Sequence, residues 1–285
     1  MKLKNNALLI VNKPEGYTSR DVVNIISKKF ETKKVGHNGT LDPLATGVLV
    51  ICLNRYTKLN NILSSDEKEY IATVKLGIST DTLDITGKII KEDYKKINKK
   101  DLIQTLNKFN CTYEQEVPLY SAVKVNGKKL YEYARNGENV ILPRKKVTIK
   151  SVELLSLNDK EFTFKCLVSK GTYIRSLIKD ILVDLNTIGV MSDLKRVKQG
   201  MFSIENSYSL DDVLNDNYEF SYLKDVLNVP KINVDNCLLK MIQNGVPLRG
   251  NYPDRVLFMN DNEEIAVYVK ENDTMKMEVL LKNID

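Results

Sequence analysis

The sequence predicts an α+β fold, with a mixed, mainly antiparallel sheet flanked by helices and a small β-rich module at the C-terminus. Apolar runs typical of strands occur in pairs, without the regular strand–helix alternation that a parallel sheet requires. The character of the chain also changes near "NVPKINVDN" (228–236), beyond which one helix precedes three short strands. We therefore expect two domains, residues 1–230 and 231–285.

The first elements follow from local patterns. "ALLIV" (7–11) is a short apolar run that ends at the turn "NKPEG", as a buried strand does. "TSRDVVNIISKKF" (18–30) has an apolar face at helical spacing, and Thr18 and Asp21 have the spacing of a capping box. "VLVICL" (48–53) predicts a second buried strand, and residues 69–92 predict strands on both sides of a polar turn.

The remaining elements come from the same two periodicities. Helices are expected where apolar residues recur at helical spacing, namely over 98–109, within 127–140, over 172–185 and over 237–245. The helix within 127–140 should be short and should end at Gly137. Strands are expected where apolar and polar residues alternate between turn residues, namely over 145–157, 161–170, 255–260, 264–270 and 275–282.

Composition limits the function classes. A net charge of +6 suits a polyanionic partner such as nucleic acid without requiring one. The chain has four cysteines, no C-x-x-C pair and one histidine, so a zinc site is not expected and the thiols should be small buried groups. The N-terminal apolar run is too short for a signal peptide and no run could span a membrane, so a cytoplasmic protein is expected.

The loop "GHNGTLDPLATG" (36–47) carries the histidine and a constrained carboxylate. Asp42 precedes Pro43, which pushes it out of the helical region and fixes its backbone, as a catalytic carboxylate or a simple turn residue would need. His37 lies between Gly36 and Gly39. It could be a packed or surface residue, a general base or a ring that stacks on a base.

The same loop, read as "GHNGTLDPLATGVL", resembles the signature of the TruB-type tRNA pseudouridine-55 synthases. Four further motifs of this family have counterparts in family order: "LLIVNKPEGYTS", "EYIATVKLGISTDTLDITG", "VPLYSAVKVNGKKLYEYARNG" and "CLVSKGTYIRSLIKDI". The resemblance covers roughly residues 7 to 200, and the tail fits the family's small PUA-like RNA-binding module by its character. "DPLATG" is similar to the stand-alone bacterial type, which needs no guide RNA.

The resemblance implies a reaction in which the N1–C1′ bond of uridine breaks and C5 joins C1′. Asp42 is then the nucleophile, Arg175 its ion-pair partner and Tyr70 the aromatic residue that receives the flipped base and assists proton loss. Asp42 could attack the sugar, attack the base or abstract a sugar proton. His37, Tyr173, Leu194 and Lys13 are the further substrate-binding candidates, with Lys13 either supporting the site or touching phosphate. Asp84 could join this network or serve as a turn residue.

The implied substrate is the T-arm stem-loop of tRNA, bound by a monomer without metal, organic cofactor or protein partner. Lys, Arg and Tyr interleave in residues 128–135, 142–146 and 194–198, as an RNA-binding face would require. Two other readings remain open. One is a non-catalytic RNA-binding or tRNA-folding protein on the same scaffold, and the other is a hydrolase, which would want a second acid or a metal beside Asp42.

Overall fold

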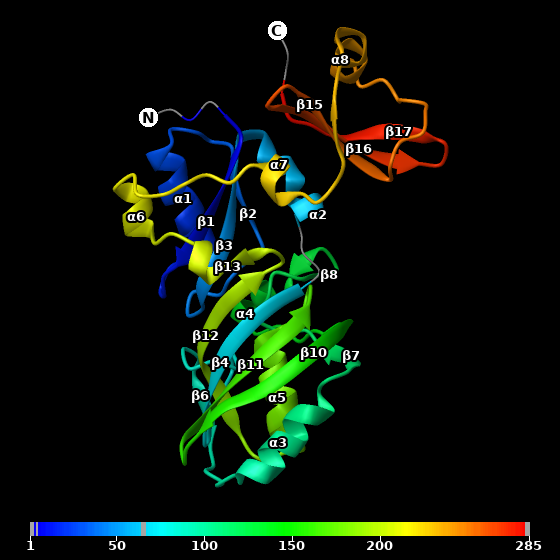
Figure 1. Cartoon of the computed structure of the whole chain (residues 1–285). Coiled ribbons are helices and arrows are strands. Elements are labelled where there is room, and N and C mark those ends of the chain that lie inside the picture. Colours follow the sequence, from blue (N-terminus) through cyan, green and yellow to red (C-terminus); the bar gives the residue numbers. More distant parts are fainter. Residues whose placement is uncertain (1–2, 4, 64–66, 283–285) are drawn as a thin grey trace. The chain divides into compact units, whose positions relative to one another are not determined.

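A computed structural model describes residues 3, 5–63 and 67–282 of the chain (Figure 1). Contacts divide the chain into two compact units. The first comprises Met1–Pro43, Val48–Ser64 and Glu205–Asp285, and the second comprises Leu44–Gly47 and Ser65–Ile204. The division at residue 230 was inferred from sequence character rather than from contacts, and it stays a prediction.

The N-terminal part of the first unit is built on two buried strands. β1 (Ala7–Lys13) and β3 (Thr46–Leu53) are neighbours in the sheet and consist almost entirely of buried residues. β2 (Val35–Asn38) pairs with β3 in antiparallel register. The helix α1 (Ser19–Lys29) begins with the predicted capping box, in which Thr18 and Asp21 satisfy each other's backbone N–H groups.

Short helical segments complete this part of the unit. They are two 3₁₀ helices, Asn54–Leu59 and Ile204–Asn206, with α2 (Asn60–Leu63), α6 (Leu210–Leu214) and α7 (Leu223–Val226).

The tail of the first unit has a sheet and a core of its own. Its elements are β14 (Lys231–Asn233), α8 (Asn236–Gln243), β15 (Arg255–Asn260), β16 (Glu263–Glu271) and β17 (Thr274–Leu280). The strands lie in the order β14-β15-β16-β17, with β14 and β15 parallel. Ile242 of α8 packs in one cluster with Phe258 and Tyr268 of the sheet. A core made from residues 231–285 alone supports the prediction that this segment is a module.

The second unit contains a twisted sheet with the strand order β12-β4-β11-β10-β7 (Figure 1). These strands span Gly189–Gln199, Glu67–Leu76, Glu161–Ser169, Arg144–Leu157 and Thr112–Glu116. Neighbours are antiparallel, and β12 also pairs in parallel with Thr46 and Gly47 at the start of β3. Helix α3 (Lys99–Lys108) contacts β10, and helix α5 (Ile174–Asp184) contacts β12 and β7.

The second unit also contains several smaller elements. They are β5 (Ile78–Thr80), β6 (Ile89–Glu92), β8 (Lys124–Val125), β9 (Lys128–Lys129), α4 (Leu130–Asn136) and β13 (Phe202–Ser203). The predicted end of α4 is confirmed, because Gly137 caps it in the left-handed conformation with φ 64°.

Gly47 is required by the approach of β3 to β12. Its φ is +102°, and a Cβ atom built there would lie 2.2 Å from the carbonyl oxygen of Arg196. Only glycine combines this backbone conformation with such a close approach. The glycine that ends the quoted loop therefore fixes the start of β3 against the strand that carries Leu194.

Three expectations are wrong in detail. His37 was expected on a loop, but it lies in β2, where its backbone pairs with Ile51. Cys52 and Cys166 are buried as expected, whereas Cys111 and Cys237 are exposed. β12 was not predicted as a strand, because the charged residues within "GVMSDLKRVKQ" hide its alternation.

Within the described part of the chain, no helix is long and apolar enough to cross a membrane. Those same residues contain no cluster of three or more histidine, cysteine, aspartate or glutamate side chains suited to a metal ion.

Candidate active site

The backbone on both sides of Asp42 is held by hydrogen bonds from the N-terminal segment. The hydroxyl of Ser19, at the start of α1, donates to the carbonyl oxygen of Leu41 at 3.1 Å and accepts from its N–H at 2.9 Å. The carbonyl oxygen of Pro43 accepts from the N–H of Gly16 at 2.9 Å. A carboxylate between two fixed residues is presented in one position, as a catalytic group requires.

Lys13 supports this loop from inside the unit. Its side chain has an exposed fraction of 0%. Its ammonium group donates to the carbonyl oxygens of Pro14 at 2.8 Å, Tyr17 at 2.6 Å and Pro43 at 3.2 Å. A lysine buried among three backbone acceptors is placed to hold the turn and the Asp42 loop together. This position favours the supporting role over phosphate contact.

His37 occupies a short strand beside the same loop. β2 pairs with β3 from Val35 opposite Leu53 to Asn38 opposite Val50. The imidazole of His37 is half-buried and the next side chain, Asn38, is buried. The strand fixes the backbone of His37, and the residue as a whole is only partly covered.

In the second unit, Tyr70 and Leu194 lie on one face of the sheet. Tyr70 of β4 is directly opposite Arg196 of β12, and Ala72 is opposite Leu194. Residues two apart on a strand share a face, so Tyr70, Ala72, Leu194 and Arg196 form one continuous surface. Tyr70 and Leu194 each have an exposed fraction of 6%. An aromatic ring beside a branched apolar side chain can receive a flat base on its face.

Arg175 is held in the first turn of α5. Its exposed fraction is 6%, and its guanidinium donates to the carbonyl oxygens of Thr82 and Tyr120, each at 3.1 Å. The same guanidinium lies 4.0 Å from the carboxylate of Asp84. The two carbonyl groups and Asp84 fix the buried guanidinium in one position, and its pairing with Asp42 stays a prediction.

Asp84 is fixed by its own turn. Its carboxylate accepts from the hydroxyl of Thr82 at 2.8 Å, and from the N–H and hydroxyl of Thr86 at 3.0 Å and 2.6 Å. Asp84 is therefore a turn residue, and its carboxylate also lies near Arg175. This arrangement is compatible with both interpretations of Asp84.

Tyr173 precedes α5 as its N-cap residue and is half-buried. Its N–H donates to the side-chain oxygen of Gln115 at 2.8 Å, and Gln115 itself is buried. Sequence reasoning did not find Gln115, because a glutamine in a strand carries no pattern that marks it as the support of a distant turn. It also could not find the two carbonyl groups that hold Arg175.

The structure therefore brings the predicted residues together in two groups. Lys13 supports the Asp42 loop in the first unit, near the strand of His37. Tyr70 shares a face with Leu194 in the second unit, where Arg175 and Tyr173 begin α5.

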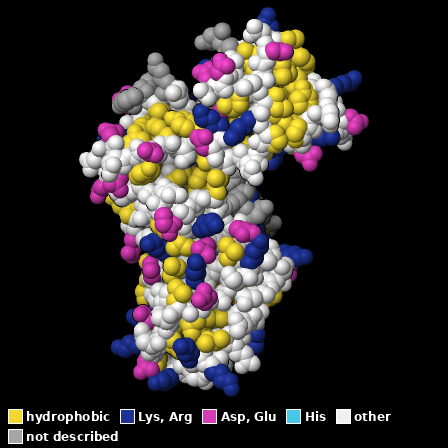
Figure 2. All heavy atoms as spheres, in the orientation of Figure 1, with side chains coloured by type: hydrophobic (Ala, Val, Ile, Leu, Met, Phe, Trp, Pro, Cys, Tyr) yellow, Lys and Arg dark blue, Asp and Glu magenta, His cyan; other side chains and the backbone are white. Residues whose placement is uncertain are grey.

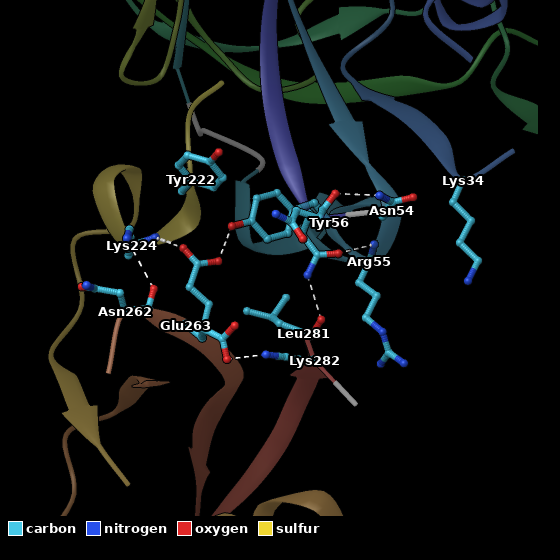
Figure 3. Close-up of a pocket in the computed structure, with 13 residues that line it drawn as sticks. Lys34, Asn54, Arg55, Tyr56, Tyr222, Lys224, Asn262, Glu263, Leu281 and Lys282 are labelled. Atoms are coloured by element: carbon cyan, nitrogen blue, oxygen red, sulfur yellow. Dashed lines mark hydrogen bonds and ion pairs between the residues drawn. The ribbon is translucent and has the colours of Figure 1, made fainter. Parts of the chain in front are cut away.

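A cavity of about 640 Å³ in the first unit contains none of these residues (Figure 3). It is lined by Asn54–Tyr56, α7 and the tail. The hydroxyl of Tyr56 donates to Glu264 and accepts from the N–H of Leu223 at 2.9 Å, and Glu264 also accepts from the N–H of Lys224 at 2.6 Å. Burial raises the pKa of both Tyr56 and Glu264. This network joins the tail to the N-terminal part, so the cavity marks a structural joint.

Positive charge is dispersed on the face drawn in Figure 2, where Lys and Arg side chains alternate with Asp and Glu. In the predicted basic segment 128–135, cations stack on tyrosines of the same segment. The Lys128 ammonium lies 4.7 Å from the ring centroid of Tyr133, and the Arg135 guanidinium 5.4 Å from that of Tyr131. These side chains are thereby ordered, and their contact with RNA stays a prediction.

Solved structures show which proteins share this fold. The chain matches one in a crystal structure of a Cbf5–Nop10–Gar1 complex with a TM-score of 0.71 and 24% identity, covering 96% of this chain and 83% of that chain. It also matches a chain of an H/ACA ribonucleoprotein bound to a substrate RNA containing 2′-deoxyuridine, with a TM-score of 0.69 and 22% identity, covering 98% and 85%. The chain thus shares the fold of the matched chains in these two complexes over nearly its whole length.

The family follows from sequence. A family model described as TruB family pseudouridylate synthase (N terminal domain) matches residues 27–174. The tRNA pseudouridine synthase B of Clostridium tetani is 42% identical over 248 residues, which are 86% of each chain. That of Acholeplasma laidlawii is 40% identical over 280 residues, covering 96% of this chain and 99% of the relative. The chain belongs to the TruB family of pseudouridylate synthases, which confirms the resemblance.

Proposed function

We propose that this protein isomerises uridine to pseudouridine at position 55, in the T loop of tRNA, with Asp42 as its essential carboxylate. Family membership supports the reaction. The observation that carries the role of Asp42 is its loop, whose backbone is fixed on both sides by Ser19, Gly16 and Lys13. A residue that only forms a turn would not require a buried lysine to fix its backbone.

We propose that the residues of the two groups act on the same uridine, as the motifs shared with the family imply. The predicted pairing of Arg175 with Asp42 in the RNA complex is part of this proposal. It would keep the carboxylate ionised.

The reaction is an isomerisation that balances without a co-reactant. The bond from N1 to C1′ breaks, the uracil turns, and a bond forms from C5 to C1′. C5 then loses its proton and N1 gains one, so the atoms of the product are those of the substrate. Asp42 can assist by attack on the sugar, attack on the base or removal of a sugar proton.

Tyr70 and Leu194 would hold the base during this rotation. Uridine must leave its stack to reach a buried face of the sheet, and unstacking costs a few kcal/mol. Tyr70 would offset part of that cost by stacking, and it would assist proton loss at C5. We assign His37 to stacking against the RNA from which the base has left, and Tyr173 to contact with the flipped nucleotide.

A non-catalytic RNA-binding protein on this scaffold is the second candidate. It would use the basic surface and the tail, but it would have no need of a buried Arg175 and a supported Asp42 together. We propose that the protein acts as a monomer without guide RNA or protein partner. A cytoplasmic location follows from the substrate and stays a prediction.

The test is to incubate the purified protein with an unmodified tRNA transcript and to map pseudouridine at single-nucleotide resolution. We expect modification at position 55 alone, without added metal or guide RNA. A transcript with cytidine at position 55 is the control and should remain unmodified. Binding of the transcript without any pseudouridine would favour the second candidate.

A further inference from the structure

Three cations gather at one end of the Tyr70 face. Lys68 lies two residues before Tyr70 on β4, so both side chains are on the same face of the sheet. Lys68 is opposite Val168 of β11, and Lys170 follows Val168 by two residues. Arg196 is opposite Tyr70 on β12. We call Lys68, Lys170 and Arg196 the cationic cluster.

The acidic neighbours of Lys68 are bound elsewhere. Glu67 and Glu69 precede and follow it on β4, and their side chains therefore point to the other face of the sheet. Glu69 pairs with Lys165 at 3.0 Å, and Glu67 pairs with Lys150. In the described part of the chain, the ammonium of Lys68 forms no hydrogen bond or ion pair. The two carboxylates nearest to Lys68 in the sequence, Glu67 and Glu69, therefore do not neutralise its charge.

The cluster makes the charged form of Lys68 unfavourable. Burial, the charge of Arg196 and the charge of Lys170, in that order, lower the pKa of Lys68 to about 8. Proteins seldom bring like charges together on a half-buried face, because each repels the others in a medium that screens poorly. A bound anion would reverse this effect, and phosphate is the anion that a nucleic-acid substrate supplies.

We propose that Lys68 binds a backbone phosphate of the RNA next to the nucleotide whose base lies on Tyr70, and so positions that nucleotide. The inference rests on the proposed function and deepens it. Lys68 and Tyr70 are about 7 Å apart along the strand. A nucleotide lying with its base on Tyr70 can reach that far with its sugar and phosphate. A lysine holds phosphate as a point charge and carries no base specificity.

The test asks whether the side chain of Lys68 interacts with one particular phosphate of the RNA. A T-arm stem-loop carries a single neutral methylphosphonate linkage at each position around uridine 55 in turn, with a 2′-O-methyl group on the adjoining sugar to prevent cleavage. The control RNA has the same 2′-O-methyl group and a normal phosphate. Binding is measured for the wild-type protein, Lys68→Met and Lys75→Met. Lys75 is an exposed lysine of the same strand and provides the matched loss of charge.

We expect Lys68→Met to weaken binding about tenfold and to lower the slope of log affinity against log salt by about 1. One neutral linkage should weaken the wild type by a similar factor and have no further effect on Lys68→Met. Lys75→Met should respond to that linkage as the wild type does. Lys68→Arg keeps the charge and should retain most of the affinity.

The proposal is overturned if Lys68→Met binds as tightly as the wild type, or if every neutral linkage weakens both proteins equally. If Lys68→Met does not fold, the linkage scan on the wild type decides, and the absence of any sensitive linkage near uridine 55 overturns the proposal. The proposed function is judged separately, by whether the wild type forms pseudouridine at position 55 in the control RNA.

Discussion

The ammonium nitrogen of Lys13 lies 3.2 Å from the carbonyl oxygen of Pro43 and donates a hydrogen bond to it. The bond joins residues at the end of β1 and in the loop before β3, and it fixes the backbone next to Asp42. Because Lys13 is fully buried, its ammonium group faces backbone carbonyl oxygens, those of Pro14 and Tyr17 among them, rather than the solvent. The position of Asp42 therefore depends on a residue that cannot itself reach the substrate.

Lys13→Met should lower the rate of pseudouridine formation and leave RNA affinity almost unchanged. Three carbonyl groups lose their donor, so we expect the free energy of unfolding to fall by about 1–3 kcal/mol. A carboxylate displaced by about 1 Å can lose roughly 100-fold in rate. Single-turnover rates and binding at several salt concentrations provide the measurement. Lys33→Met, at an exposed site, is the control. A lower salt slope for Lys13→Met alone would instead assign Lys13 to phosphate binding.

Gly47→Ala should disrupt the pairing of β3 with β12. The new Cβ atom would lie 2.2 Å from the carbonyl oxygen of Arg196, so one strand must move. We expect a loss of more than about 4 kcal/mol in the free energy of unfolding. Gly127→Ala also has positive φ but meets no atom within 4 Å, and it should cost only about 1–2 kcal/mol. Denaturant unfolding would measure both, and equal losses would contradict the role of close approach.

Tyr56→Phe should weaken the joint between the tail and the N-terminal part. Its hydroxyl donates to Glu264 and accepts from Leu223, and both groups lose that partner in a buried setting. We expect a loss of about 1–3 kcal/mol. Tyr222→Phe removes a hydroxyl from a more exposed ring in the same cavity and is the control. Thermal unfolding at neutral pH distinguishes the two variants. Equal melting temperatures would contradict a stabilising role for the Tyr56 network.

His37→Phe should retain more activity than His37→Ala. Phenylalanine keeps an aromatic ring on β2 and loses both nitrogens, which suits a stacking role. Rates under single-turnover conditions, with binding measured alongside, provide the test. Equal losses in the two variants would assign hydrogen bonding or proton transfer to His37.

Much of the fold was predictable because its elements obey simple periods. β1 and β3 are short apolar runs, α1 carries its capping box, and the tail strands alternate between turn residues. β12 escaped prediction because Arg196, a charged residue, is fully buried in the middle of it. A four-residue strand such as β2, with glycine at its second position, is also too short for a periodic signal.

For the candidate site, the sequence predicted the motif residues but not the groups that hold them in place. Asp42, Tyr70 and Arg175 stand in motifs that resemble a known family, so their chemistry could be expected. The groups that hold the site in place could not be expected, because Ser19 binds Leu41 and Gln115 binds Tyr173 across segments far apart in the sequence. The burial of a lysine or the like charges around it cannot be read from its neighbours along the chain.

The most direct test of the central claim is the single-turnover rate of Asp42→Asn on a T-arm stem-loop RNA. Asparagine keeps the size of the side chain and suits the same turn, but it removes the negative charge and nearly all nucleophilicity. We predict that binding survives while pseudouridine formation falls by several orders of magnitude, the usual scale for a group that acts in the chemical step. Pseudouridine formation at the wild-type rate would contradict the assignment of Asp42 as the essential carboxylate.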